Sequence, residues 1–215
     1  THDSYGNTLT SVRQKSGDAA FIKTESTYTA NGNYVATQTG DSRETVTNQW
    51  NTELGLLNQV TDPEGSAQSY TYDNMGNLTR TERVVGGATV FNAYTYQDDL
   101  LTGISHSNGA DTSTAYTFTY NDLQQNVSTK VGSQTLMTNA YDSVTNLLTQ
   151  SLFGNNQSLS FGYTDRDELA TVTFSGDTAP RYQYRYENTG ELSEVVDNAN
   201  GRITRFTYTP DGSLK

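Results

Sequence analysis

The stretch Tyr70-Thr-Tyr-Asp-Asn-Met-Gly-Asn-Leu-Thr-Arg80 decides the fold, because its spacing predicts a β-hairpin. Tyr70 and Tyr72 alternate with hydroxyl residues at period two, which places both rings on one face of a strand. Asp73 to Gly76 supply a type I turn that ends in glycine, where a left-handed residue creates a bulge and reverses the chain. Leu78 then begins the return strand.

The same pattern recurs along the whole chain as an aromatic residue or His, followed by polar turn residues and then usually Leu. We call the aromatic or His position the anchor. Successive anchors lie 21–26 residues apart, at His2, Tyr28, Trp50, Tyr72, Tyr96, Tyr120, Tyr141, Tyr163, Tyr186 and Tyr208. An internal period of this length indicates a repeat architecture. The sequence therefore predicts an all-β protein whose tandem β-hairpin repeats form a curved, extended sheet. We expect residues 1-215 to be a single array of about ten repeats, truncated at both ends.

The residue four or five positions after an anchor is expected to reverse the chain with a positive φ. Glycine or asparagine stands there in seven repeats, at Gly6, Gly32, Gly55, Gly76, Asn146, Gly190 and Gly212. Both residue types tolerate that conformation, whereas Gln124 is the poorest fit to it. A five-bladed propeller is the alternative fold, since two repeats of about 22 residues equal one four-stranded blade of roughly 40–45 residues.

Composition sets limits on this prediction. Leu, Ile, Val and Phe make up only 39 of the 215 residues and the formal net charge is −11, which is a range usually read as disordered. The fifteen Tyr argue for a fold instead, because each can bury roughly 150–250 Å² while its hydroxyl stays hydrated. The 13 Lys and Arg are scattered among 24 Asp and Glu, so no nucleic-acid partner is expected.

The absence of Cys suits a secreted or surface protein. No stretch predicts membrane insertion, and targeting signals are expected to lie outside this sequence.

Reactive residues do not gather in any one repeat. His2 and His106 occupy unrelated positions, so neither a catalytic site nor a metal or cofactor site is expected. Asp165, Asp167 and Glu168 fit turn positions better than a calcium site. Three segments match the glycosylation acceptor pattern, namely Asn77-Leu-Thr79, Asn126-Val-Ser128 and Asn156-Gln-Ser158. Such matches are frequent by chance in a chain rich in Thr and Asn, and in a bacterial protein they are expected to be unused.

The segment Tyr72-Asp-Asn-Met-Gly-Asn-Leu78 resembles the YD repeat of RHS (rearrangement hot spot) proteins, as do its relatives that begin at Tyr186 and Tyr208. The resemblance covers essentially the whole chain and is nearest in style to Gram-positive wall-associated RHS proteins. It implies a segment of a hollow β shell that encloses a C-terminal toxin domain. Relatives use such shells in insecticidal toxin complexes and in animal cell-surface adhesion proteins.

The predicted function is therefore that of a non-catalytic structural segment in an RHS protein that is secreted or lies at the bacterial cell surface or cell wall. Its expected partners are the remainder of its parent chain and an enclosed toxin domain, and its terminal strands are expected to allow edge-to-edge self-association. The alternative is a module that binds carbohydrate, such as cell-wall glycan, through exposed aromatic rings. The single Trp50, and Tyr at period two on strands, favour inter-strand packing over sugar binding.

Overall fold

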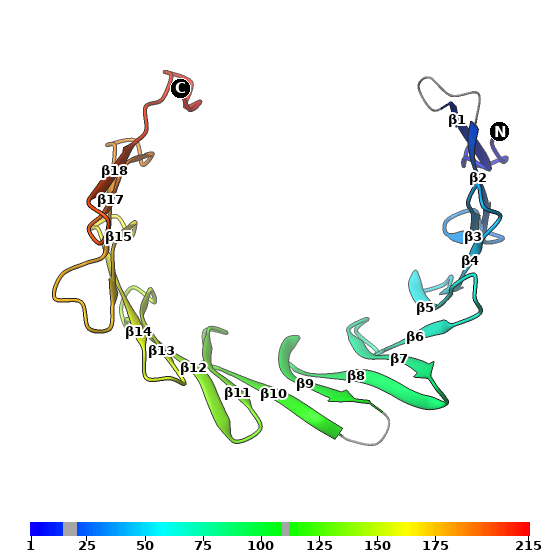
Figure 1. Cartoon of the computed structure of the whole chain (residues 1–215), viewed down its shortest axis with the longest axis horizontal. Helices are drawn as coiled ribbons and strands as arrows, with labels where there is room; N and C mark the ends of the chain where they lie inside the picture. Colours follow the sequence, from blue (N-terminus) through cyan, green and yellow to red (C-terminus); the bar gives the residue numbers. More distant parts are fainter. Residues whose placement is uncertain (15–20, 109–111) are drawn as a thin grey trace. The chain divides into compact units, whose positions relative to one another are not determined.

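The computed structural model describes residues 1–14, 21–108 and 112–215. Contacts divide the chain into two compact units, which are unit 1 (Thr1–Ala115) and unit 2 (Tyr116–Lys215). Both units consist of β-strands joined by short connections (Figure 1). The segments form strands because apolar or aromatic residues alternate with Thr, Ser and Gln, and β-branched and aromatic side chains fit a pleated, half-buried surface.

Unit 1 is a sheet in which each strand pairs antiparallel with the next one along the chain. Its strands are Thr10–Gln14 (β1), Phe21–Tyr28 (β2), Val35–Thr39 (β3), Thr45–Asn51 (β4), Leu56–Thr61 (β5), Ala67–Tyr72 (β6), Leu78–Val85 (β7), Ala88–Gln97 (β8) and Leu100–Ser107 (β9). Strand Thr112–Tyr120 (β10) begins in unit 1 and ends in unit 2.

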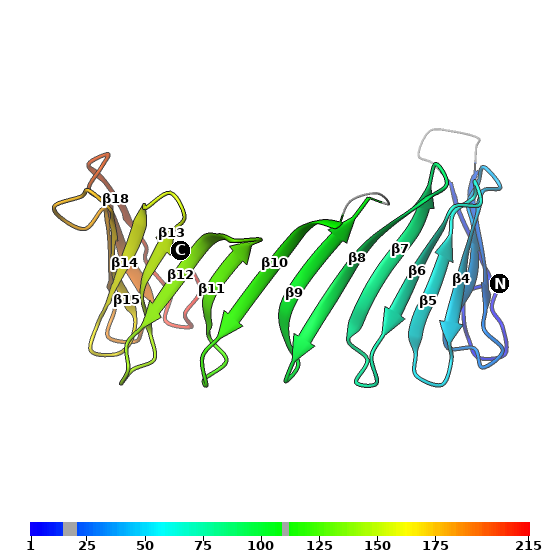
Figure 2. The same cartoon turned by 90° about the horizontal axis from the view of Figure 1, so that it is seen from below.

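Unit 2 repeats the same arrangement, with consecutive antiparallel pairs from β10 to β18. Its further strands are Asn126–Val131 (β11), Gln134–Tyr141 (β12), Leu148–Phe153 (β13), Ser158–Tyr163 (β14), Leu169–Phe174 (β15), Tyr182–Tyr186 (β16), Leu192–Asp197 (β17) and Arg202–Arg205 (β18). In each unit the turns lie alternately at the two ends of the strands, so that they form two opposite rows, which we call the two edges (Figure 2).

The prediction of an all-β fold made of tandem hairpins is confirmed. Each unit is a single layer of strands that bends along its own length (Figure 1). The propeller alternative is wrong, because pairing continues without a break from β1 to β9 and again from β10 to β18. A blade would end after four strands.

A single layer of strands buries few side chains completely. Val172, at 8% exposed, is the one apolar side chain buried within the described part of the chain, alongside the polar residues Ser107, Ser151 and Glu194. Most of the stabilisation must therefore come from ladder hydrogen bonds and from half-buried side chains that pack across neighbouring strands. The pairing register also determines which side chains share a face of the sheet. Tyr70 pairs with Thr81 on one face, and Thr71 pairs with Arg80 on the other.

Candidate functional site

The repeated structural element is the anchor, and it lies at a β-bulge. In the hairpin of β6 and β7 the register shifts between Thr71 and Tyr72, so that Tyr72 pairs with Leu78. The same shift occurs at Tyr28, Trp50, Tyr96, Tyr120, Tyr141, Tyr163 and Tyr186. His2 and Tyr208 form isolated bridges to Thr8 and Leu214. A bulge increases the local twist, and here it recurs at eight of the ten anchors.

The turn that follows the anchor is organised by the residue after it. Asp73 accepts hydrogen bonds at Oδ1 from the backbone N–H groups of Met75 and Asn77, both at 2.9 Å. Acceptance of the Asn77 N–H lowers the pKa of the Asp73 carboxyl below its ordinary value. Asn121 holds its own turn in the same way, at 3.1 Å from the Leu123 N–H and 3.0 Å from the Gln125 N–H.

Each of these turns is closed by a residue with positive φ. The angle is +89° at Gly76, +60° at Asn146 and +62° at Gln124. The other turn positions named from the sequence, Gly6, Gly32, Gly55, Gly190 and Gly212, also have positive φ. The shortened turn after Tyr96 uses Asp98 and Asp99, both with positive φ, which is the two-residue hairpin geometry.

The polar atom at the far end of the anchor side chain reaches the preceding hairpin. It donates to the backbone carbonyl of the residue that pairs with the preceding anchor, and we call this contact the anchor rung. The donor and acceptor residues are Tyr28 and Thr8 (3.3 Å), Trp50 and Val35 (2.9 Å), Tyr72 and Leu57 (2.9 Å), Tyr96 and Leu78 (3.0 Å), Tyr141 and Asn126 (3.0 Å), Tyr163 and Leu148 (2.9 Å), Tyr186 and Leu169 (2.8 Å), and Tyr208 and Leu192 (2.9 Å). At these positions the hydroxyl or indole N–H of the anchor therefore has a backbone carbonyl as its acceptor.

The anchor hydroxyls are also partly removed from water. This desolvation raises the pKa of Tyr72, Tyr96, Tyr163 and Tyr186 above the ordinary value for tyrosine. Only the neutral, protonated hydroxyl can donate to a carbonyl. The anchor rung and the raised pKa therefore agree, because both favour the protonated form of the tyrosine.

A second kind of contact links turns that are adjacent along one edge. The Asn7 amide donates to the Gly32 carbonyl at 2.7 Å, and the Gln125 amide donates to the Asn146 carbonyl at 2.7 Å. Both donors lie five residues after their anchors. Glu191 occupies the same position, but its Oε2 is buried without a hydrogen-bond partner. A carboxylate cannot donate, so this contact is incomplete there.

Aromatic packing adds to these links near the start of unit 1. The rings of Tyr34 and Trp50 stack with centroids 4.7 Å apart and an interplanar angle of 20°. The Tyr5 ring lies against Gly32, where an added Cβ would be 2.5 Å from the ring. Glycine is therefore required at this turn for space as well as for its φ.

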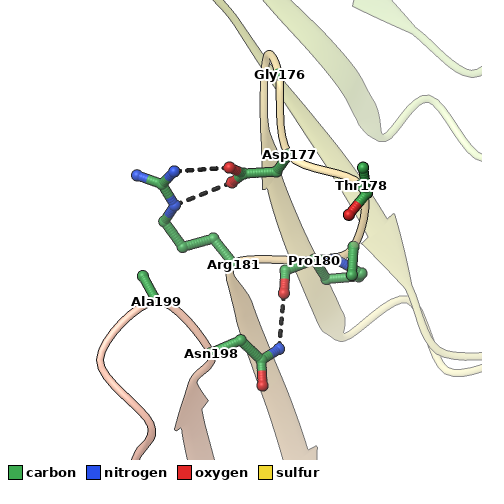
Figure 3. Close-up of a pocket in the computed structure, with 8 residues that line it drawn as sticks. Gly176, Asp177, Thr178, Pro180, Arg181, Asn198 and Ala199 are labelled. Carbon is green, nitrogen blue, oxygen red and sulfur yellow. Dashed lines mark hydrogen bonds and ion pairs between the residues drawn. The ribbon is translucent and has the colours of Figure 1, made fainter.

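Some of the charged groups pair with one another. Glu194, 8% exposed, lies between Arg185 at 2.5 Å and Arg205 at 2.8 Å. The connection between β15 and β16 borders a cavity of about 360 Å³, in which both oxygens of Asp177 meet the Arg181 guanidinium (Figure 3). This pairing lowers the pKa of Asp177 and leaves no net charge to attract an ion.

The two histidines lie on separate elements. His2 Nδ1 is 3.4 Å from the Thr8 hydroxyl, and His106 Nδ1 is 2.9 Å from Asn92 Oδ1. Among the described residues, no group of three or more acidic or His side chains could hold a metal ion. Asp167 has a φ of +63° in its turn, and Glu168 is 3.2 Å from Arg166. Nor does the described part of the chain contain a helix long and apolar enough to cross a membrane.

These features define a class of protein built from tandem β-hairpins that are linked through their anchors. Solved structures of TcdB2-TccC3 have the same fold, with a TM-score of 0.59 and 18% identity over 100% of this chain and 15% of the matched one. Another structure, of TcdB2-TccC3 without its hypervariable C-terminal region, gives the same values. The Tc holotoxin pore of Photorhabdus luminescens matches over 90% of this chain and 13% of its own, at 17% identity and a TM-score of 0.55.

The family model described as the Teneurin YD-shell matches residues 58–214, which is well over half of the sequence. The chain belongs to this family. No curated protein sequence is similar enough to count as a relative. The chain spans about 15% of the length of the first solved chains that it matches.

Proposed function

We propose that this chain is a non-catalytic wall segment of a secreted or cell-surface shell protein, and that the shell encloses a toxin domain carried at the C-terminal end of the same parent chain. The observation that carries the proposal is the anchor rung, which has the same donor and acceptor positions in both units. A contact that recurs from hairpin to hairpin within each unit extends a wall and creates no local site.

Two further observations support enclosure. The described side chains with shifted pKa values are carboxyls, the anchor hydroxyls and the Arg181 guanidinium, and each shift is explained by a structural hydrogen bond, an ion pair or burial. A general acid or base would instead be expected as an outlier in one repeat, lying in a cleft. One solved shell of this fold also belongs to a protein with a hypervariable C-terminal region, as a carrier of exchangeable cargo would have.

The alternative, a glycan-binding repeat, would need free aromatic faces with free polar groups beside them. Trp50 stacks one face on Tyr34 and uses its indole N–H in the anchor rung. The anchor tyrosines likewise use their hydroxyls within the sheet. These contacts favour enclosure over glycan binding. We further propose that the protein is extracellular, either secreted or at the bacterial cell wall.

Limited proteolysis of the full-length parent protein tests the proposal. We expect the C-terminal domain to resist digestion while the wall is intact, and to become digestible when Tyr163→Ala and Tyr186→Ala weaken two rungs. Tyr184→Ala is the matched control, because it also removes a tyrosine ring two positions from an anchor, but the Tyr184 hydroxyl makes no hydrogen bond within the described residues.

A glycan array screened with the 215-residue chain gives the independent result. Specific binding at micromolar strength, together with a C-terminal domain that is digested equally fast in all variants, would replace enclosure with the glycan-binding function.

A further inference from the structure

The three Asn-X-Ser/Thr segments are not used by the proposed function, and the structure distinguishes sharply between them. An N-linked glycan is bulky and requires a surface asparagine whose side-chain amide is free to react. The hydroxyl two residues later must also be approachable. Each segment can be compared with these requirements from its hydrogen bonds and exposure.

Asn77 does not meet them. Its half-buried amide donates to Asp73 Oδ2 at 3.2 Å and to Asp99 Oδ1 at 3.2 Å, which links two neighbouring turns. The Thr79 hydroxyl donates to the Thr71 carbonyl at 3.1 Å. A glycan on this amide would therefore break contacts that hold two hairpins together.

Asn126 is equally engaged. It begins β11, pairs with the anchor Tyr120, and its amide lies 3.4 Å from the Thr119 carbonyl and 3.3 Å from the Ser128 carbonyl. Its own carbonyl accepts the anchor rung from Tyr141. The Ser128 hydroxyl is buried and has no hydrogen-bond partner. Neither half of this acceptor segment is accessible in the folded sheet.

Asn156 differs from both. It lies in the connection between β13 and β14 with an exposed side chain and a φ of +63°. Its backbone N–H donates to the Phe153 carbonyl at 2.9 Å, so the turn is fixed by the main chain. The side-chain amide makes no hydrogen bond within the described part of the chain. Ser158 begins β14 and is half-buried, and its hydroxyl likewise makes no hydrogen bond among the described residues. This turn lies at the edge opposite the anchor turns, so no anchor rung of unit 2 would be disturbed.

Contrary to the expectation that all three segments are unused, we propose that Asn156 is an N-glycan acceptor site. The donor would be an oligosaccharide carried on a polyprenyl diphosphate. The Asn156 amide nitrogen would form a bond to the anomeric carbon, and the carbon–oxygen bond to the diphosphate would break. The amide gives up one proton, and the lipid diphosphate leaves with the electron pair. The glycan would add a hydrated group at a turn tip without replacing any existing hydrogen bond.

Secretion of the 215-residue chain from a eukaryotic host tests the site by glycopeptide mass spectrometry. We expect most molecules to carry one glycan, on Asn156, and none to carry a glycan on Asn77 or Asn126. Ser158→Ala should abolish the glycan and Ser158→Thr should retain it. Ser128→Ala and Thr79→Ala should leave occupancy at Asn156 unchanged.

The secreted protein must also show the β-sheet circular dichroism spectrum, so that occupancy is measured on folded chains. A bare Asn156 in both the natural sequence and Ser158→Thr would overturn the proposal. A glycan on Asn77 or Asn126 in folded protein of unchanged melting temperature would do so as well, because the hydrogen bonds would then not protect those sites.

Discussion

Replacement of Tyr72 by Phe removes one anchor rung and keeps the ring in place. The lost contact is the 2.9 Å hydrogen bond from the Tyr72 hydroxyl to the Leu57 carbonyl. A hydrogen bond of this kind contributes about 0.5–1.5 kcal/mol net, and a carbonyl left unpaired adds to the loss only so far as water cannot reach it. Leu57 is half-buried, so we expect a loss of about 1 kcal/mol.

Thermal and urea unfolding measure this loss against a matched control. Tyr70 lies on the same face of β6, is also half-buried, and makes no hydrogen bond through its hydroxyl within the described residues. Tyr70→Phe should therefore be close to neutral, while Tyr72→Phe lowers the melting temperature by about 4 °C for a cooperative unit of roughly 100 residues. Equal effects of the two substitutions would refute the anchor rung as a source of stability.

The pH dependence gives a second readout of the same contact. Desolvation raises the pKa of Tyr72 above its ordinary value of 10.0, so the folded state holds this proton more tightly than the unfolded state does. Its contribution is complete below pH 10 and is lost as pH rises through the folded pKa. Tyr72→Phe should therefore lose less stability between neutral pH and the alkaline range than the natural sequence does. An unchanged alkaline slope would contradict this reasoning.

Five further substitutions test the turns by urea unfolding. Gly32→Ala should cost more than Gly76→Ala, because both have positive φ but only at Gly32 would the added Cβ meet a ring, at 2.5 Å; equal costs would mean that this ring moves aside freely. Gln124→Gly should stabilise the protein by about 0.5–1 kcal/mol, because the residue has a φ of +62° that glycine adopts without strain, and a loss of stability would contradict this. Glu191→Gln should stabilise the protein, because an amide can donate at the place where Asn7 and Gln125 donate in their turns and where Oε2 has no hydrogen-bond partner; a destabilised variant would show that the hydrogen bond from Thr189, which lowers the pKa of Glu191, matters more. The pKa of Asp73 is lowered because its carboxylate accepts a hydrogen bond from a backbone N–H, so the stability that Asp73 contributes is present above pH 3.8 and is lost as pH falls through the folded pKa. Asp73→Asn should therefore lose less stability on acidification than the natural sequence does. The same loss of stability at acid pH in both proteins would exclude Asp73 as its source.

Local features were predictable from the sequence because they depend on few residues. A period-two strand, a polar turn and a glycine are enough to fix the hairpin at Tyr72 and the positive φ at Gly76. The repeat of this pattern was enough to predict the fold class. Even Gln124, the poorest match, adopts the turn conformation, because the bonds of Asn121 to the backbone hold that turn.

Contacts between hairpins were not predictable in the same way. The acceptor for Tyr72 is the carbonyl of Leu57, fifteen residues earlier, and nothing in the sequence near Tyr72 specifies it. The amide contact from Gln125 to Asn146 spans 21 residues. Both depend on how one hairpin lies beside the next, which the strand pattern alone leaves open. A residue with a side-chain amide five positions after the anchor is the one signal that could have indicated the contact between turns.

The choice of residue at the anchors shows what the fold demands there. Tyr fills eight of the ten anchors, and Trp50 keeps the rung with its indole N–H at 2.9 Å from the Val35 carbonyl. The chain has seven Phe, yet none stands at an anchor. Phe does stand two residues before an anchor, as at Phe118 and Phe161, where Tyr70 occupies the equivalent place in another repeat. A ring alone is sufficient at that earlier position, whereas the anchor also needs a donor at the far end of the side chain. In natural repeats Phe thus occurs at the position equivalent to Tyr70 but not at the position equivalent to Tyr72, which is the outcome expected from Tyr70→Phe and Tyr72→Phe. This difference favours the anchor rung as the contact by which a hairpin extends the sheet.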